Sequence, residues 1–156
     1  MLKQGTDAWR ARGFAHFTPF LLALQAKACL TLHKQKEGMN FLLTALSITK
    51  TGCDQYWMAE LNCLQGELLC ESGGDSGIVE AHFRQAVETA RQQGARMLEL
   101  RAAIGLARLW QDQGRREAAQ RVLATVYNQF TEGFDTRDLR AARKLLQELS
   151  EKSLAF

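Results

Sequence analysis

Apolar residues recur at helical spacing in one segment after another along this chain. In residues 97–127, MLELRAAIGLARLWQDQGRREAAQRVLATVY, two amphipathic stretches meet at Gly114. The pattern predicts two helices that turn at Gly114 and approach closely at the small residues Ala103, Ala107 and Ala119. Because the same layout occurs twice upstream, we interpret this segment as one unit of a repeat.

The apolar spacing predicts an all-α fold of about seven or eight helices in a single domain, residues 1–156. A leading amphipathic helix is expected at residues 2–13, with Trp9 as its anchor. Three helical hairpins follow at 17–52, 54–94 and 95–131, and a capping helix at 136–151 has one charged face. Thr18 and Pro19 predict the start of the first hairpin, as an N-cap followed by proline at the first helical position.

The three hairpins share a regular period. Their first helices align at Ala26, Gly66 and Ala107, which are 40 and 41 residues apart. Further equivalent sets are Cys29, Leu69 and Trp110 in the first helices, then Leu42, Phe83 and Leu123, with Ala45, Ala86 and Val126, in the second helices. A fixed period with two helices per unit is typical of an α-solenoid. One hairpin cannot bury both faces of its helices, so neighbouring hairpins must stack on it.

The third unit resembles the tetratricopeptide repeat, whose offsets it matches at Leu106, Ala107, Trp110, Gly114, Ala119, Leu123 and Val126. This resemblance implies a right-handed α-solenoid of stacked antiparallel hairpins. The period of about 40 residues is longer than the usual period of about 34, and is similar to that of extended-helix variants of the superfamily. The lysine and asparagine set that clamps a peptide carboxylate in some members is not seen, so that activity is not expected.

A second resemblance covers nearly the whole chain. The carboxy-terminal repeat region of large bacterial signalling proteins is similar to the segments PFLLALQAKACL, AELNCLQGELLCESG, AHFRQAVETARQQGA, LELRAAIGLARLWQDQGR and FTEGFDTRDLRAARKLL. Those proteins join a class III nucleotide cyclase or a regulator domain to a predicted ATPase and then to such repeats. The resemblance implies a regulatory or scaffolding repeat module, with the leading helix as the remainder of an upstream unit.

Composition narrows the class of protein further. Hydrophobic residues make up 46% of the chain and charged residues 24%, which is ordinary for a globular protein. No apolar segment reaches the roughly 18 residues that span a bilayer, and the first residues carry no secretory signal. We therefore expect a cytoplasmic protein without membrane contact. In that compartment free buried thiols are favoured over disulfides for the four cysteines, Cys29, Cys53, Cys63 and Cys70.

No cofactor, metal or catalytic site is expected. No GxxxxGK[ST] phosphate loop is present. The three histidines, His16, His33 and His82, are isolated, and none of them has a Cys, Asp or Glu at the spacing of a zinc site. Cys63 and Cys70 share a helix face but lack two further metal ligands. If any thiol is reactive, we expect it to be Cys53, which lies in a turn. Glu60, Glu67 and Glu71 lie on one predicted helix. Paired carboxylates can act in acid–base catalysis only when they are buried together, so we favour a solvated acidic stripe for these three residues.

The surface gives a more specific hypothesis. In stacked helical hairpins the first helix of each unit lines the concave face, where extended peptides or helices dock. Projection outward from the aligned positions predicts a groove that displays Lys27, Glu60, Glu67, Glu71, Arg101, Arg108 and Gln111. An apolar pocket would be added by Phe20, Leu24 and Leu30. The alternation of basic, acidic and basic residues favours a mixed-charge peptide over a phosphate backbone. Alternatively, these residues are simply solvated or covered by a neighbouring subunit.

We therefore expect a non-enzymatic protein–protein interaction or scaffold module with a regulatory role, which binds a peptide or helix in the concave groove. The alternative is a nucleic-acid-binding repeat, because residues 84–156 hold 13 Lys and Arg against 9 Asp and Glu, whereas residues 1–83 hold 7 against 8. A third hypothesis is an enzyme of unfamiliar type acting through Cys53 or the glutamates. A homodimer is expected through the leading helix, whose flank around Leu2, Ala8 and Trp9 would stay apolar.

Overall fold

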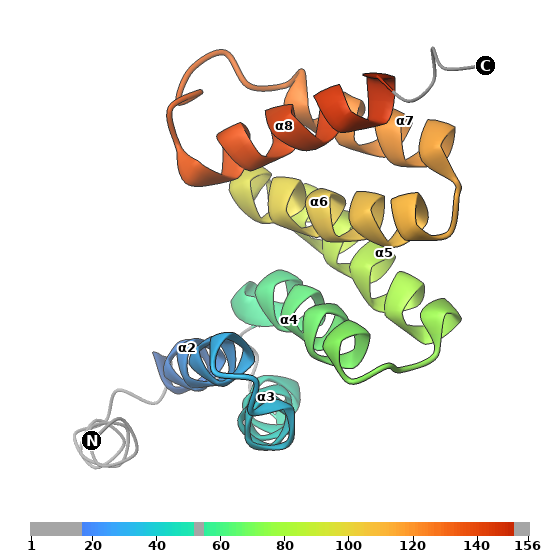
Figure 1. Cartoon of the computed structure of the whole chain (residues 1–156). Coiled ribbons are helices and arrows are strands. Elements are labelled where there is room, and N and C mark those ends of the chain that lie inside the picture. The colour runs from blue at the N-terminus through green and yellow to red at the C-terminus, as the bar shows by residue number, and fades with distance from the viewer. Residues whose placement is uncertain (1–16, 52–54, 152–156) are drawn as a thin grey trace.

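The computed structural model of the chain describes residues 17–51 and 55–151, and all regular structure within these ranges is helical (Figure 1). The expectation of an all-α fold is confirmed for these residues. Their elements are α2 (Thr18–Thr31), α3 (Gln35–Thr51), the short 3-10 helix η2 (Gln55–Trp57), α4 (Met58–Glu71), α5 (Ser76–Gln92), α6 (Arg96–Asp112), α7 (Arg116–Tyr127) and α8 (Arg137–Glu151). The predicted leading helix at 2–13 lies outside the described residues, and the homodimer expected through it stays a prediction.

The start of α2 differs from the sequence prediction. Thr18 is not an N-cap but the first residue of α2, and no side chain caps that helix. The reason is burial, because Thr18 is packed in the interior with only 3% of its surface exposed. By contrast, α5 begins at Ser76 because the carboxylate of Asp75 accepts hydrogen bonds from the N–H groups of Gly77 and Ile78, at 2.9 and 3.1 Å.

The ends of the first helices repeat one backbone geometry. The left-handed region is occupied at equivalent positions by His33, Gly73 and Gly114, with φ of 55, 70 and 76°. In each case the next N–H donates to a carbonyl five residues back, over 2.8 Å from Lys34 to Cys29, 2.8 Å from Gly74 to Leu69 and 2.7 Å from Arg115 to Trp110. These turns are 40 and 41 residues apart, which is the period of the aligned apolar positions.

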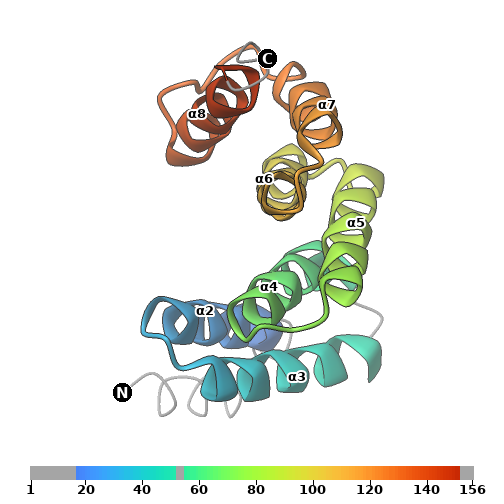
Figure 2. The same cartoon turned by 45° about the vertical axis from the view of Figure 1, so that its right-hand side comes forward.

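The helices follow an open arc. Each α-helix packs against the next along the chain, and α2, α4, α6 and α8 also contact one another in succession. Figure 2 shows these four helices along the inner side of the arc, with α3, α5 and α7 outside them. We call the surface formed by α2, α4, α6 and α8 the inner face, and that formed by α3, α5 and α7 the outer face.

The core forms where a second helix lies between two first helices. The aligned positions of the second helices are almost fully buried, including Leu42, Phe83 and Leu123. The ring of Phe83 on α5 packs against two glycines, Gly66 of α4 and Gly105 of α6. A Cβ at Gly66 would lie only 3.0 Å from the ring, and one at Gly105 closer still. Small residues at these positions therefore allow three helices to meet around one aromatic ring.

Candidate functional site

Four charged residues, one from each helix of the inner face, form a continuous series of ion pairs. Lys27 Nζ lies 3.5 Å from Glu60 Oε1, and the other oxygen of Glu60 lies 3.8 Å from Arg101 Nη1. Arg101 Nε donates to Asp138 Oδ2 over 2.6 Å. The series links α2 to α4, α4 to α6 and α6 to α8. We call these four residues the ion chain.

The repeat explains the centre of the ion chain. Glu60 and Arg101 are 41 residues apart and so occupy equivalent positions on stacked helices, where opposite charges attract. Partial burial by itself would lower the pKa of Arg101, but the hydrogen bond and charge of Asp138, together with Glu60, raise that pKa. The guanidinium therefore stays charged, and the ion chain links neighbouring helices of the inner face.

The structure brings Lys27, Glu60 and Arg101 together, as the predicted groove requires, but their charges are directed at one another. The basic–acidic–basic alternation in the sequence thus joins adjacent helices of the inner face. Because the pairs are partly exposed, their net contribution to stability is modest and a ligand can still compete for them.

Glu67 lies beside the ion chain and next to a buried thiol. The Cys63 Sγ donates to Glu67 Oε1 over 3.9 Å, and Cys63 is 4% exposed. Burial raises the pKa of Glu67, with the charge of Glu60 adding to the effect and that of Lys27 opposing it. Burial, followed by the charges of Glu67 and Glu60, also raises the pKa of the Cys63 thiol well above its ordinary value. Cys63 is therefore a protonated core thiol.

Glu71 belongs to a different part of the inner face. It lies at the end of α4, where its Oε2 accepts a hydrogen bond from Gln35 Nε2 over 3.4 Å and lies 3.5 Å from His33 Nδ1. These contacts tie α4 to the turn between α2 and α3. The structure therefore does not group Glu71 with the ion chain.

The last two predicted groove residues, Arg108 and Gln111, lie at a shallow depression between α6 and α8. Its volume is about 310 Å³, and it is lined by Arg108, Gln111, Asp112, Ala141, Lys144, Leu145 and Glu148. Arg108 is exposed and makes no ion pair with any of the described residues. We call this depression the α6–α8 groove.

Sequence reasoning missed the contribution of α8 to the inner face. Residues 136–151 were expected to act as a cap, yet α8 supplies Asp138 to the ion chain and Lys144 and Glu148 to the α6–α8 groove. One signal was present, because Asp138 follows Arg101 by 37 residues, close to the repeat period. Extension of the period by one more helix would have placed α8 beside α6.

A second polar cluster surrounds Trp110. The indole is 7% exposed, and the guanidinium groups of Arg84 and Arg115 lie 5.4 and 4.6 Å from the ring centroid. Glu80 pairs with both arginines, at 2.7 and 2.8 Å. Partial burial alone would raise the pKa of Glu80, but the neighbouring Trp110 indole and the two guanidinium groups lower it overall. The cluster ties α5 to α6 and to the turn before α7.

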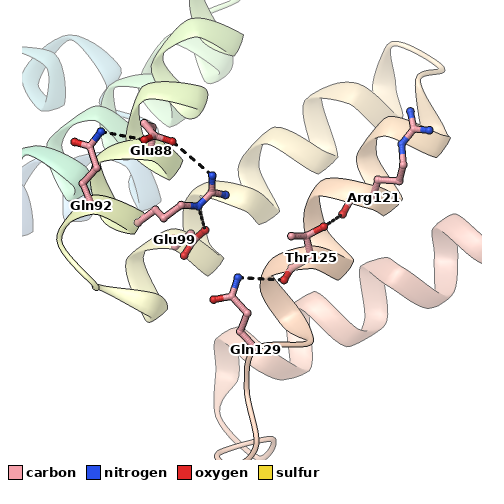
Figure 3. A network of polar contacts seen from close by, with 7 residues as sticks. Glu88, Gln92, Glu99, Arg121, Thr125 and Gln129 are labelled. Atoms are coloured by element: carbon pink, nitrogen blue, oxygen red, sulfur yellow. Dashed lines mark hydrogen bonds and ion pairs between the residues drawn. The ribbon is translucent and has the colours of Figure 1, made fainter.

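Figure 3 shows a third polar network, in which Glu99 at the start of α6 is held by the end of α5. Glu99 is 3% exposed and accepts a hydrogen bond from Arg91 Nε over 3.0 Å. Arg91 also pairs with Glu88 at 3.5 Å, and Glu88 accepts from Gln92 over 2.9 Å. The buried carboxylate is thus paired and hydrogen-bonded within the fold, as a structural group must be.

The cysteines follow the prediction only in part. Cys29 and Cys63 are buried free thiols, as expected, whereas Cys70 is free but exposed at the end of α4. Cys53 lies outside the described residues. Within the described ranges, no group of three or more His, Cys, Asp or Glu could hold a metal ion. In the same ranges, no helix has both the length and the apolar character needed to cross a membrane.

Comparisons of the chain with protein-family models, curated proteins and solved structures find no match. The geometry of the inner face is therefore the basis for inferring function. That face offers a row of paired charges and, next to it, one groove that contains an exposed arginine.

Proposed function

We propose that this chain is a non-enzymatic interaction or scaffold module of the tetratricopeptide-like type, a right-handed α-solenoid whose inner face binds a peptide or helix of a partner protein. The observation that supports this proposal most directly is the shared period. The aligned small residues and the left-handed residues that end α2, α4 and α6 recur at the same 40- and 41-residue spacing. A stack of equivalent hairpins supplies an extended inner surface, which such proteins use for binding.

The α6–α8 groove is the part of the inner face best suited to a ligand. The charges of the adjacent ion chain are paired with one another, whereas Arg108 is exposed at the groove. Preorganisation of the surrounding surface by the ion chain would reduce the ordering cost of binding. The resemblance to repeat regions of bacterial signalling proteins supports a regulatory role for this binding.

The lining of the groove favours a peptide with both acidic and basic side chains. Arg108 and Lys144 supply positive charge, and Asp112 and Glu148 supply negative charge. Ala141 and Leu145 give the groove an apolar part where a small hydrophobic side chain would pack. The mixed charge is the same property that the sequence predicted for the whole inner face.

The test is a selection of displayed peptides against the full chain, followed by affinity measurement with two matched charge reversals. Arg108→Glu alters the groove, whereas Arg121→Glu alters an exposed arginine on α7 of the outer face (Figure 3). We expect Arg108→Glu to weaken binding by about tenfold or more and Arg121→Glu to leave it unchanged. Equal affinities of the wild type and Arg108→Glu would argue against the groove as the binding site.

The second candidate function is nucleic-acid binding, which is favoured by exposed basic residues on α8, namely Arg137, Arg140, Arg143 and Lys144. Acidic side chains interrupt this positive surface, with Asp138 in the ion chain and Glu148 within 3.9 Å of Lys144. Phosphate contacts are strongest at low salt. We therefore expect no electrophoretic mobility shift with RNA or DNA at about 50 mM salt, and a shift there that is lost on neutralising Arg140 and Arg143 would favour this second function.

A further inference from the structure

The inner face carries two rows of charges at repeat-equivalent positions of α4 and α6. Glu60 and Arg101 form one row, and Glu67 and Arg108 form the other, about two helical turns further along the same helices. In each row the two residues are 41 positions apart, with a carboxylate on α4 and a guanidinium on α6. The first row is closed by an ion pair of 3.8 Å between Glu60 and Arg101. We call Glu67 and Arg108 the open pair.

Glu67 is a partly buried carboxylate without a paired cation. It makes no ion pair with another described residue, and the hydrogen bond that it accepts comes from the Cys63 thiol, a weak donor, over 3.9 Å. The nearest positive charges, on Lys27 and Arg101, are paired with Glu60 instead. A buried charge that lacks a partner costs stability, and proteins keep such groups chiefly at functional sites.

Arg108 is the matching unpaired cation on the next helix of the inner face. It is exposed at the α6–α8 groove, and its guanidinium forms no ion pair within the described ranges. Because α4 and α6 contact each other, Glu67 and Arg108 belong to one continuous surface. The axes of packed helices lie about 8–10 Å apart, so a single ligand can reach both residues.

Building on the proposed binding function of the inner face, we propose that the open pair selects an extended segment of the partner protein by the order of its charges. A basic side chain of the segment pairs with Glu67, and an acidic side chain pairs with Arg108. A segment with the reverse order brings like charges together at both helices, which disfavours its binding. Because an extended chain rises about 3.3 Å per residue, the two side chains are about three positions apart.

The burial of Glu67 separates this role from a purely structural one. A basic side chain of the partner would supply the cation that the fold does not provide, and the free protein bears the cost of the unpaired carboxylate. Glu67→Gln keeps the shape of the side chain and removes its charge, so we expect this variant to be at least as stable as the wild type at pH 7. The same variant should bind the segment less tightly, a combination that a structural carboxylate would not give.

Coupling between the protein and its ligand tests the proposal. The probes are peptides selected from a displayed random library against the full chain, provided that Arg108→Glu weakens their binding. We expect these peptides to share a basic and an acidic residue about three positions apart. Exchanging the basic residue for Gln should weaken binding to the wild type by about tenfold and hardly affect binding to Glu67→Gln. Exchanging the acidic residue for Gln should show the same pattern between the wild type and Arg108→Gln.

The matched control is Glu117→Gln, which removes an exposed carboxylate on α7 of the outer face. In this variant both peptide exchanges should weaken binding as much as they do in the wild type. Unfolding free energies of the free variants show that a loss of affinity in Glu67→Gln does not arise from a loss of structure.

The outcomes separate the open pair from the proposed function. Peptides that depend on Arg108 but bind Glu67→Gln as tightly as the wild type would overturn the open pair and leave the proposed function standing. A basic peptide residue whose exchange weakens binding equally in the wild type and in Glu67→Gln would overturn it as well. Failure to select any peptide that depends on Arg108 would count against the proposed function itself, and against the open pair with it.

Discussion

The guanidinium of Arg101 on α6 donates to the carboxylate of Asp138 on α8 over 2.6 Å, while its other side reaches Glu60 on α4 at 3.8 Å. One side chain therefore bridges three helices of the inner face. The planar guanidinium suits this role because it offers several donors in fixed directions, which the single ammonium of lysine does not.

The pair of Arg101 and Asp138 should be measurably coupled. In a double-mutant cycle with Arg101→Met and Asp138→Asn, we expect a coupling free energy of about 0.5–1 kcal/mol, a value limited by the 39% exposure of Arg101. Urea unfolding gives the four free energies, and added salt should reduce the coupling. The exposed pair of Lys144 and Glu148, at 3.9 Å, is the control and should couple more weakly. Equal coupling in the two pairs would contradict a special role for the ion chain.

Gly105 should tolerate no side chain while Phe83 is present. Gly105→Ala would force the buried Phe83 ring to move, and we expect a loss of about 1–3 kcal/mol in the free energy of unfolding. The smaller side chain of Phe83→Leu should make the added methyl group less costly, so the two changes should be non-additive. Urea denaturation of the two single variants and the double variant measures this. Strict additivity would show that the methyl group at 105 does not meet the ring.

The left-handed residues that end α2 and α6 should respond in opposite ways to substitution. Gly114→Ala puts a Cβ where φ is 76° and should lower stability by about 1 kcal/mol. His33→Gly relieves a side chain at φ of 55° and should raise stability by a smaller amount, about 0.5 kcal/mol. Thermal or urea unfolding gives the two signs. Destabilisation by both changes would mean that the side-chain contacts of His33 outweigh its backbone strain.

Burial of Glu67 should make it a source of pH-dependent instability. The pKa of Glu67 is raised in the folded chain above its ordinary value of 4.5. At a pH between the unfolded and the folded pKa, the native state therefore keeps a proton that the unfolded state has lost. The associated stability is present below the unfolded pKa and is lost as the pH rises through the folded pKa. Glu67→Gln should therefore be more stable than the wild type at pH 7, and this difference should shrink below about pH 4.5.

Glu80 provides the opposite control for that experiment. Its pKa is lowered in the folded chain, so it contributes stability above the ordinary pKa that is lost as the pH falls. Glu80→Gln should therefore destabilise the protein at pH 7. Unfolding free energies of both variants at pH 4 and pH 7 test the two signs together. A change of the same sign at positions 67 and 80 would contradict the assigned environments.

The helices and their period could be predicted from the sequence because both depend on local spacing. Apolar positions three and four residues apart define each helix, and the small residues Ala26, Gly66 and Ala107 mark equivalent close contacts. His33 shows that the repeat alignment also predicts backbone conformation. It stands where Gly114 stands in the third unit, and the structure gives both residues a left-handed backbone although only one is glycine.

The arrangement of the inner face could not be predicted fully, because it depends on contacts between distant segments. Lys27, Glu60 and Arg101 were found as exposed positions of the first helices, but periodicity does not reveal that their charges pair with one another. The role of Asp138 could not be predicted, because a charged outer face on the last helix is also what a capping helix shows. Thr18 was misplaced because a preference for capping does not show that the residue is buried.

The most direct measurement of the central claim, that the inner face binds a partner, is site-specific photo-crosslinking in the cells that produce the protein. A photoreactive residue replaces Gln111 in the α6–α8 groove in one variant, and Gln85, exposed on α5 of the outer face, in the other. We expect a discrete protein adduct from position 111 that is lost when Arg108 is also changed to Glu, and none from position 85. Adducts of equal yield from both positions, or from position 85 alone, would contradict the claim.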